Sequence, residues 1–562
     1  MMTKRGLVAG QQVPDVIESA ATELKSNDSI PTTEEIHFER LLKVLGYFGK
    51  FQVRLFTITC LLDFSASWIM VFYVFANVVP KWKCAEYSGN QTVVSFSNHI
   101  VGNSTSGVCK IDGNKCIKFE YNTTDSINSI VKEWDLVCDQ SFIPKLTVSI
   151  QMAGVLIGAL CCGYLAEWVG RKKTLLVYCS GVMIFQVIAG LSVNYYMYIV
   201  LRFFIGFCIA GPFCLCYTLP MEFCGPKWRT FVGALSLFGF APMMLAFFAY
   251  YLRNWQHLAF VTGAIFMPAV IAAMIWVPES IRWLTMKGRF EEAEKTIRWM
   301  ARVNRTQVPD LGLLRALAAQ DKSEQEEGKR HNYLDLFCTR ELAIQTLTLM
   351  YASFCCSTIF YGVSTMYSTF EGTIFMNAIL NSCVVMPLVW TAIYSGNRFG
   401  RRNSFFGYMT VPVLCLLIFL IIGLLDKKSE AGVGILMTVL VIVGQGAVLA
   451  GWQLIGIYGI ETFPTVIRTM GISSCSTVSR IGGIIAPQIA YLGIAIHWTV
   501  PYAVYFIFCI SATVLVFLYL PETNKKPLKD AVPVTARMSR TRSELEPIQE
   551  ETSADCLNED AV

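Results

Sequence analysis

Three charged side chains lie deep within apolar runs of this 562-residue chain, where a charge is costly and therefore marks a candidate site. Arg480 is the strongest candidate, because a guanidinium is always charged and can hold a carboxylate through two hydrogen bonds. The competing explanation is a structural role beside an acid of another helix. Asp63 is suited to attract a cation, to couple a proton or sodium ion, or to pair with a basic residue. For Arg202 we expect a structural role.

Aromatic and amide side chains in the same runs would complete a binding site. Aromatic rings attract quaternary ammonium groups through cation–π interaction, which makes Tyr361, Trp452 and Tyr217 candidates. Gln445 adds a polar contact. Because 13% of the chain is aromatic, ordinary helix packing is the competing explanation for each single ring.

The composition identifies the elements that must position these residues. Hydrophobic residues make up 54% of the chain and charged residues 15%, against about 25% charged in soluble proteins. A net charge of +5 is no nucleic-acid signature. The five histidines are scattered and indicate no metal site, and the chain has no phosphate-binding loop for ATP. We therefore expect an integral membrane protein without a cofactor, in contact with the lipid bilayer and with no nucleic-acid partner.

Apolar runs of about 20 residues predict an all-α membrane protein with twelve transmembrane helices. The expected spans are about 55–79, 146–166, 174–194, 197–221, 230–251, 256–277, 343–366, 373–394, 404–425, 433–458, 469–494 and 499–520. The corresponding domains are a tail at 1–45, a six-helix bundle at 46–278, a loop at 279–342, a second six-helix bundle at 343–523 and a tail at 524–562.

The positive-inside rule sets the orientation. Lys and Arg cluster after spans two and eight, whereas the turns after spans three and eleven have none. Both termini are therefore expected in the cytoplasm, and 80–145 forms the large outside loop. This loop has three glycosylation sequons, at Asn90, Asn103 and Asn122, and four cysteines that fit two disulfides in an oxidising compartment. The cysteines are Cys84, Cys109, Cys116 and Cys138, and their three possible pairings stay open.

The two halves repeat each other. After the second span of each half stand glycines and basic residues, and after the fourth span stands a glutamate followed seven positions later by an arginine. The residues are Gly163, Glu167, Gly170, Arg171, Lys172, Glu222 and Arg229 in the first half, and Arg398, Gly400, Arg401, Arg402, Glu461 and Arg468 in the second. Six spans plus six give a cavity between two bundles. We expect these cations to pair with acids at the cytoplasmic face and to hold the halves together until the cavity opens inward.

These motifs resemble the major facilitator superfamily. Pro278-Glu279-Ser280-Ile281-Arg282, the long cysteine-containing loop and Trp134 to Asp139 are similar to the organic cation/anion/carnitine transporter family, over roughly residues 45–525. The resemblance places Glu279 and Arg282 in the gate, gives Tyr361 a position facing the cavity, and matches Arg480 to the arginine of the anion and carnitine branches.

The resemblance implies a secondary transporter, not an enzyme, that moves small organic ions across the plasma membrane by alternating access. A carnitine-like zwitterion fits one arginine and several aromatic rings, and quaternary ammonium or other organic cations come next. An organic anion would also fit Arg480, a plain cation would use Asp63, and a receptor or scaffold that carries nothing is the remaining class. Whether transport is coupled to an ion, sodium or a proton, stays open.

Overall fold

The computed structural model describes residues 41–80, 82–87, 91–92, 109–111, 114–121, 127–225, 228, 238–308, 333–367, 370–425, 432–464 and 467–523. Eleven helices in these ranges are long and apolar enough to cross a membrane, and Phe238–Leu252 is a shorter apolar helix. The short one lies within the fifth predicted span, whose first residues are outside the described part. The prediction of a twelve-helix fold is confirmed.

The first half begins with a helical turn at 41–45 and continues with the following elements. They are α3 Lys50–Met70, α4 Tyr73–Ala76, α5 Ile130–Glu133, η1 Cys138–Gln140, α6 Ile143–Trp168, α7 Arg171–Ala189, α8 Tyr195–Met221, η2 Phe238–Phe240, α10 Ala241–Leu252, α11 Trp255–Ala264 and α12 Met267–Trp276. Asn194 caps α8 by accepting a hydrogen bond from the Met197 amide. Short helices α13 Ile281–Met286 and α14 Phe290–Asn304 follow.

The second half repeats the plan. Its elements are η3 Tyr333–Phe337, α16 Arg340–Ser364, α17 Ile374–Phe399, α18 Arg401–Leu424, α19 Val433–Thr462, α20 Arg468–Ala495 and α21 Val500–Tyr519. Thr339 and Thr373 cap α16 and α17 through their side-chain oxygens. Pro387, Pro412 and Pro487 lie inside helices of this half, which lipid-embedded helices tolerate when neighbouring groups satisfy the backbone.

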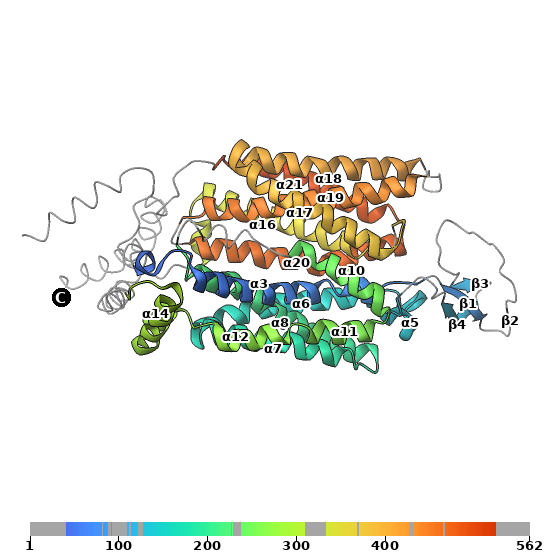
Figure 1. The fold of residues 1–562 in the computed structure, drawn as a ribbon. Coiled ribbons are helices and arrows are strands. Elements are labelled where there is room, and N and C mark those ends of the chain that lie inside the picture. Colours follow the sequence, from blue (N-terminus) through green and yellow to red (C-terminus); the bar gives the residue numbers. More distant parts are fainter. Residues whose placement is uncertain are drawn as a thin grey trace, which may run out of the picture.

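The two bundles lie side by side in Figure 1, with α6 packed along α20 and α10 along α17. The strands lie at one end of the molecule, which we call the sheet end, and α14 lies at the opposite end, the α14 end. At the sheet end the bundles are in direct contact. Lys145 Nζ donates to the Thr365 carbonyl at 2.7 Å, Ser149 Oγ donates to the Ile484 carbonyl at 2.6 Å, and the rings of Phe75 and Phe375 stack at 6.0 Å.

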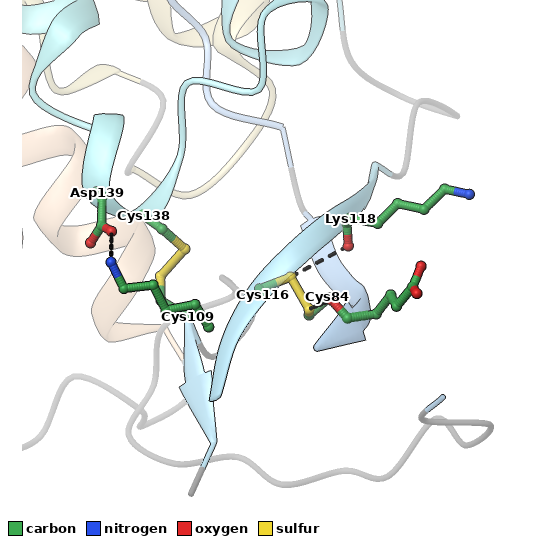
Figure 2. Close-up of a disulfide and its surroundings, with 8 residues drawn as sticks. Cys84, Cys109, Cys116, Lys118, Cys138 and Asp139 are labelled. Carbon is green, nitrogen blue, oxygen red and sulfur yellow. Dashed lines mark hydrogen bonds and ion pairs between the residues drawn. A yellow bond between two sulfur atoms is a disulfide. The ribbon is translucent and has the colours of Figure 1, made fainter. Parts of the chain in front are cut away.

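The segment predicted as an outside loop contains a small antiparallel sheet that the sequence analysis did not foresee. Its strands are β1 Trp82–Tyr87, β2 Gln91–Thr92, β3 Lys110–Ile111 and β4 Asn114–Tyr121, in the order β2-β1-β4-β3. Two disulfides join Cys84 to Cys116 and Cys109 to Cys138 (Figure 2). The first links β1 to β4, and the second ties the sheet to the segment that leads into α6.

Candidate functional site

Arg480 lies where the two bundles meet. Its guanidinium is 5.6 Å from the ring centre of Phe213, which belongs to α8 of the other bundle. Tyr361 of α16 lies close enough to interact electrostatically with Arg480, and its ring packs edge-on against Trp452 at 6.2 Å. Nε of Arg480 is buried and has no hydrogen-bond partner in the described part of the chain. The guanidinium therefore has spare capacity to hold an anionic group.

The aromatic rings continue around this position and come from both bundles. Phe360 contacts Trp452 at 6.3 Å and Phe238 at 6.0 Å, and Phe238 contacts Phe213 at 6.3 Å. We call Phe213, Phe238, Phe360, Tyr361 and Trp452 the aromatic cluster. Rings of this kind can take up a quaternary ammonium group through cation–π attraction. The structure thus brings together Arg480, Tyr361 and Trp452, which the sequence indicated only as separate candidates.

Asp63 forms a second polar position on the first bundle. It is 3% exposed, and its Oδ2 accepts a hydrogen bond of 2.7 Å from the Tyr217 hydroxyl. Its Oδ1 is buried without a hydrogen-bond partner among the described residues. Tyr217 follows Phe213 by four residues on α8, so both lie on one helix face about 5–6 Å apart. One face of α8 therefore contacts Arg480 through one ring and Asp63 through the next.

Two other buried polar residues make hydrogen bonds within their own bundles. The Gln445 amide donates to the Phe360 carbonyl at 3.0 Å and to Ser364 Oγ at 2.7 Å, and its oxygen accepts from the Tyr367 hydroxyl. It thus joins α19 to α16, and substrate contact stays a prediction. Arg202 is fully buried, donates to the side-chain oxygens of Gln151 and Gln186, and lies 5.2 Å from the Phe72 ring. These contacts support its structural role inside the first bundle.

At the α14 end the two halves make the same hydrogen bonds. Glu279 Oε1 accepts from the backbone amides of Arg171 and Lys172 at 2.7 and 3.0 Å. Glu522 accepts in the same way from the amides of Arg401 and Arg402 at 2.8 and 3.1 Å. Each carboxylate thus caps the N-terminus of a membrane helix, where negative charge is favoured. Glu279 was predicted in the gate, but Glu522 was missed although Pro521-Glu522-Thr523 repeats Pro278-Glu279-Ser280.

Glycine is required just before each cap. Gly170 and Gly400 have φ of +115° and +95°, a region that L side chains rarely adopt. An added Cβ would lie 2.4 Å from Glu279 Oε2 in one half and 2.5 Å from Glu522 Oε2 in the other. Gly163 differs, because an added Cβ there meets nothing within 4 Å. Of these motif glycines, Gly170 and Gly400 are therefore the two that the capping arrangement requires.

The ion pairs at this end join helices of the same bundle. Arg171 Nε lies 3.6 Å from Glu222 Oε1, and Arg401 lies 2.8 Å from Glu461 Oε1. In the state described by this structure these pairs lie within one bundle, because each half supplies both the base and the acid. That the cations hold the halves together while the cavity faces outward stays a prediction. Burial raises the pKa of Glu222, while Ser280, Arg171 and Arg282 act to lower it.

The remaining gate residues occupy varied positions. Lys172 Nζ donates to the Met274 carbonyl at 2.9 Å, and Arg402 donates to the Phe517 carbonyl, so the second cation of each motif reaches the last helix of its bundle. Arg468 Nε donates to the Phe463 carbonyl at 3.3 Å. Glu167 and Arg398 are exposed, and Trp283 donates to the Glu167 carbonyl at 2.9 Å. Arg229, like the sequon residues Asn90, Asn103 and Asn122, lies outside the described residues.

Comparison with known proteins finds transporters. A sequence profile of the family described as "Sugar (and other) transporter" matches residues 69–534. The human "Organic cation/carnitine transporter 2" is 31% identical over 423 residues, covering 74% of this chain and 73% of the relative. The "Organic cation transporter-like protein" of Drosophila melanogaster is 28% identical over 527 residues, covering 87% of this chain and 90% of the relative.

Solved structures agree on the fold. The inward open xylose transporter XylE from E. coli superposes with a TM-score of 0.57 at 14% sequence identity, covering 85% of this chain and 97% of that one. At this identity the likeness shows the arrangement of helices alone.

Proposed function

Because the chain belongs to the organic cation, anion and carnitine transporter family of the major facilitator superfamily and moves small organic ions by secondary transport, we propose that its substrate is a carnitine-like zwitterion. The carboxylate of the substrate pairs with Arg480, and its ammonium group lies against the aromatic cluster and toward Asp63. Neither contact involves covalent chemistry.

One observation carries this proposal. Beside one face of α8 lie a buried guanidinium nitrogen and a buried carboxylate oxygen, and neither has a hydrogen-bond partner among the described residues. A buried polar atom of a charged group that lacks a hydrogen-bond partner is costly, so each of these two atoms gains from a ligand group of opposite charge. A molecule that carries both charges would satisfy both groups at once. A plain anion would satisfy only Arg480, and a plain cation only Asp63.

The direction of transport depends on which end of the molecule faces the outside of the cell. We propose that the sheet end faces outside, because disulfides persist in oxidising compartments, and that the basic α14 end faces the cytoplasm. Plasma-membrane location, cytoplasmic termini and glycosylation at Asn90, Asn103 and Asn122 belong to the same proposal. In the described structure the sheet end is closed by contacts between the bundles, so substrate would exchange at the α14 end.

A competition uptake panel tests the substrate class. Cells or proteoliposomes containing the chain would be offered carnitine, tetraethylammonium and para-aminohippurate. The proposal predicts that carnitine is taken up best and that the other two compete more weakly. Preference for para-aminohippurate would favour an organic anion transporter, and preference for tetraethylammonium would favour a plain cation transporter. The absence of any uptake would favour a receptor or scaffold.

Asp63 has a second possible task, which the same assay separates. If it carries a coupling proton or sodium ion, Asp63→Asn removes the dependence of uptake on that ion gradient while exchange of substrate continues. If it holds the ammonium group, Asp63→Asn weakens carnitine binding and leaves the dependence on the gradient unchanged.

A further inference from the structure

A small cavity lies between the two bundles at the sheet end, and we call it the seam cavity. Its volume is about 10 Å³, which is the space that one occupant of the size of water needs. Its lining belongs to both bundles and consists of Tyr73, Val74, Asn77, Lys145, Val148, Ser364, Thr365 and Tyr367. Because both bundles contribute, the cavity exists only while they are in contact at this end.

The seam cavity has a positive charge and no negative one. Of the lining residues only Lys145 is charged. Its ammonium donates to the Thr365 carbonyl at 2.7 Å and forms no ion pair with any residue that the structure describes. An ammonium has three protons to donate, so two of them have no partner among the described residues. A cation enclosed without a counter-charge is costly, and an anion in the cavity would lower that cost.

A second donor without a partner belongs to Tyr73. This residue is 2% exposed, and its hydroxyl is buried with no hydrogen-bond partner among the described residues. Ser364 and Tyr367, by contrast, use their hydroxyl groups within the second bundle, where they donate to the Phe360 carbonyl and to the Gln445 side-chain oxygen. The spare hydroxyl of the lining is therefore the phenol of the first bundle, which also supplies the ammonium.

Asn77 adds an acceptor to this set. Its Nδ2 donates to the Pro144 carbonyl at 2.8 Å, and its Oδ1 is buried without a partner among the described residues. A water molecule would suit this oxygen and the Tyr73 hydroxyl, because water both donates and accepts. Water would leave the charge of Lys145 uncompensated, whereas an anion compensates it in a seam of low dielectric constant, where charges attract strongly. The charge of the cavity therefore favours an anion.

We propose that the seam cavity binds a small monovalent inorganic anion of the size of chloride. The anion accepts hydrogen bonds from the Lys145 ammonium and the Tyr73 hydroxyl. Gluconate, sulfate and the organic substrates are too large for this volume. Because separation of the bundles divides the lining, the anion binds only while the sheet end is closed and thereby stabilises the closed state. The site is distinct from Arg480 and does not depend on the proposed function.

The melting temperature of the purified full chain tests anion binding. It would be measured in potassium chloride and in potassium gluconate of equal ionic strength. Wild type should melt at a higher temperature in chloride, because a ligand stabilises the state that binds it. Lys145→Met should remove this difference, Lys145→Arg should keep it, and Tyr73→Phe should reduce it. Lys132→Met is the matched control, since it removes a lysine of α5 at the same end and should leave the difference intact.

Cysteine labelling measures the effect of the anion on opening of the seam. Val148→Cys puts a thiol into the lining, at a position that is 1% exposed. In purified protein, chloride in place of gluconate should slow its reaction with a maleimide about tenfold, as expected for a charge-assisted hydrogen bond gained only in the closed state. This effect adds to the bond between Lys145 and Thr365, which is present in both salts. With Lys145→Met, labelling should be equally fast in both salts.

Two results would overturn the proposal. Equal melting temperatures and equal labelling rates of the wild-type seam in both salts would leave water as the occupant of the cavity. An anion effect that persists unchanged in Lys145→Met would assign the anion to another place. Neither measurement uses a transported substrate, so absent uptake of carnitine would count against the proposed function alone.

Discussion

The contact between Lys145 and Thr365 should hold the sheet end closed. Lys145 belongs to α6 of the first bundle, and its ammonium donates at 2.7 Å to the Thr365 carbonyl, which ends α16 of the second bundle. A cation at a helix C-terminus is also favoured by the helix dipole. Tyr73, Ser364 and Tyr367 line the same small pocket. Opening of the sheet end separates these two partners, so the contact stabilises the closed state selectively.

The magnitude follows from the type of bond. A hydrogen bond from a charged donor contributes about 1.5–3 kcal/mol, and water replaces part of it when the seam opens. We therefore use the lower value of ~1.5 kcal/mol, which is about a tenfold change in the ratio of closed to open molecules. Lys145→Met keeps the length of the side chain and removes the charge. It should raise the open population about tenfold.

An accessibility assay measures this change. Val148 is 1% exposed and lines the same pocket, so Val148→Cys reports on opening of the seam. A membrane-impermeant maleimide added outside should label this cysteine about tenfold faster in the Lys145→Met background. Lys145→Arg should preserve slow labelling, and Lys132→Met of α5 controls for loss of a lysine at the same end. Equal labelling rates with Lys145 and with Met at that position would refute the reasoning.

Two further predictions concern the α14 end. Gly170→Ala and Gly400→Ala should each destabilise the folded protein by about 1–3 kcal/mol of backbone strain and so lower the melting temperature of purified protein. Gly163→Ala should leave the melting temperature unchanged, and equal melting temperatures in all three variants would contradict the capping geometry. Because burial raises the pKa of Glu222, the folded protein holds this proton more tightly than the unfolded chain does, so the group's contribution to stability declines as pH rises from the ordinary range to the raised pKa. Glu222→Gln should remove that component from the plot of melting temperature against pH, and an unchanged plot would exclude it.

The helices and the repeat could be predicted from the sequence because they depend on local patterns. Long apolar runs mark the spans, and the duplicated Gly and Glu motifs mark corresponding places in both halves. The same logic would have found Glu522 from the repeated Pro-Glu-Ser/Thr. Strand β4 also had a signal, since Ile117, Phe119 and Tyr121 alternate with polar residues.

The site itself could not be predicted in the same way. Arg480 and Phe213 come from different bundles, and their contact depends on how the bundles pack. Gln445 appeared as a ligand because amides suit polar substrates, yet its hydrogen bonds are made within the second bundle. The pairing of acid and base within each half likewise depends on helix ends that only the three-dimensional fold brings together.

Charge reversal at Arg480 tests the central claim most directly. Uptake of carnitine and of tetraethylammonium would be measured side by side in wild type and Arg480→Asp, normalised to surface protein, with Arg302→Asp on exposed α14 as the control for charge reversal. Loss of a charged contact of about 1.5–3 kcal/mol should lower carnitine uptake roughly ten- to hundredfold, while tetraethylammonium uptake is retained or rises. An equal loss for both substrates at normal surface level would contradict the account.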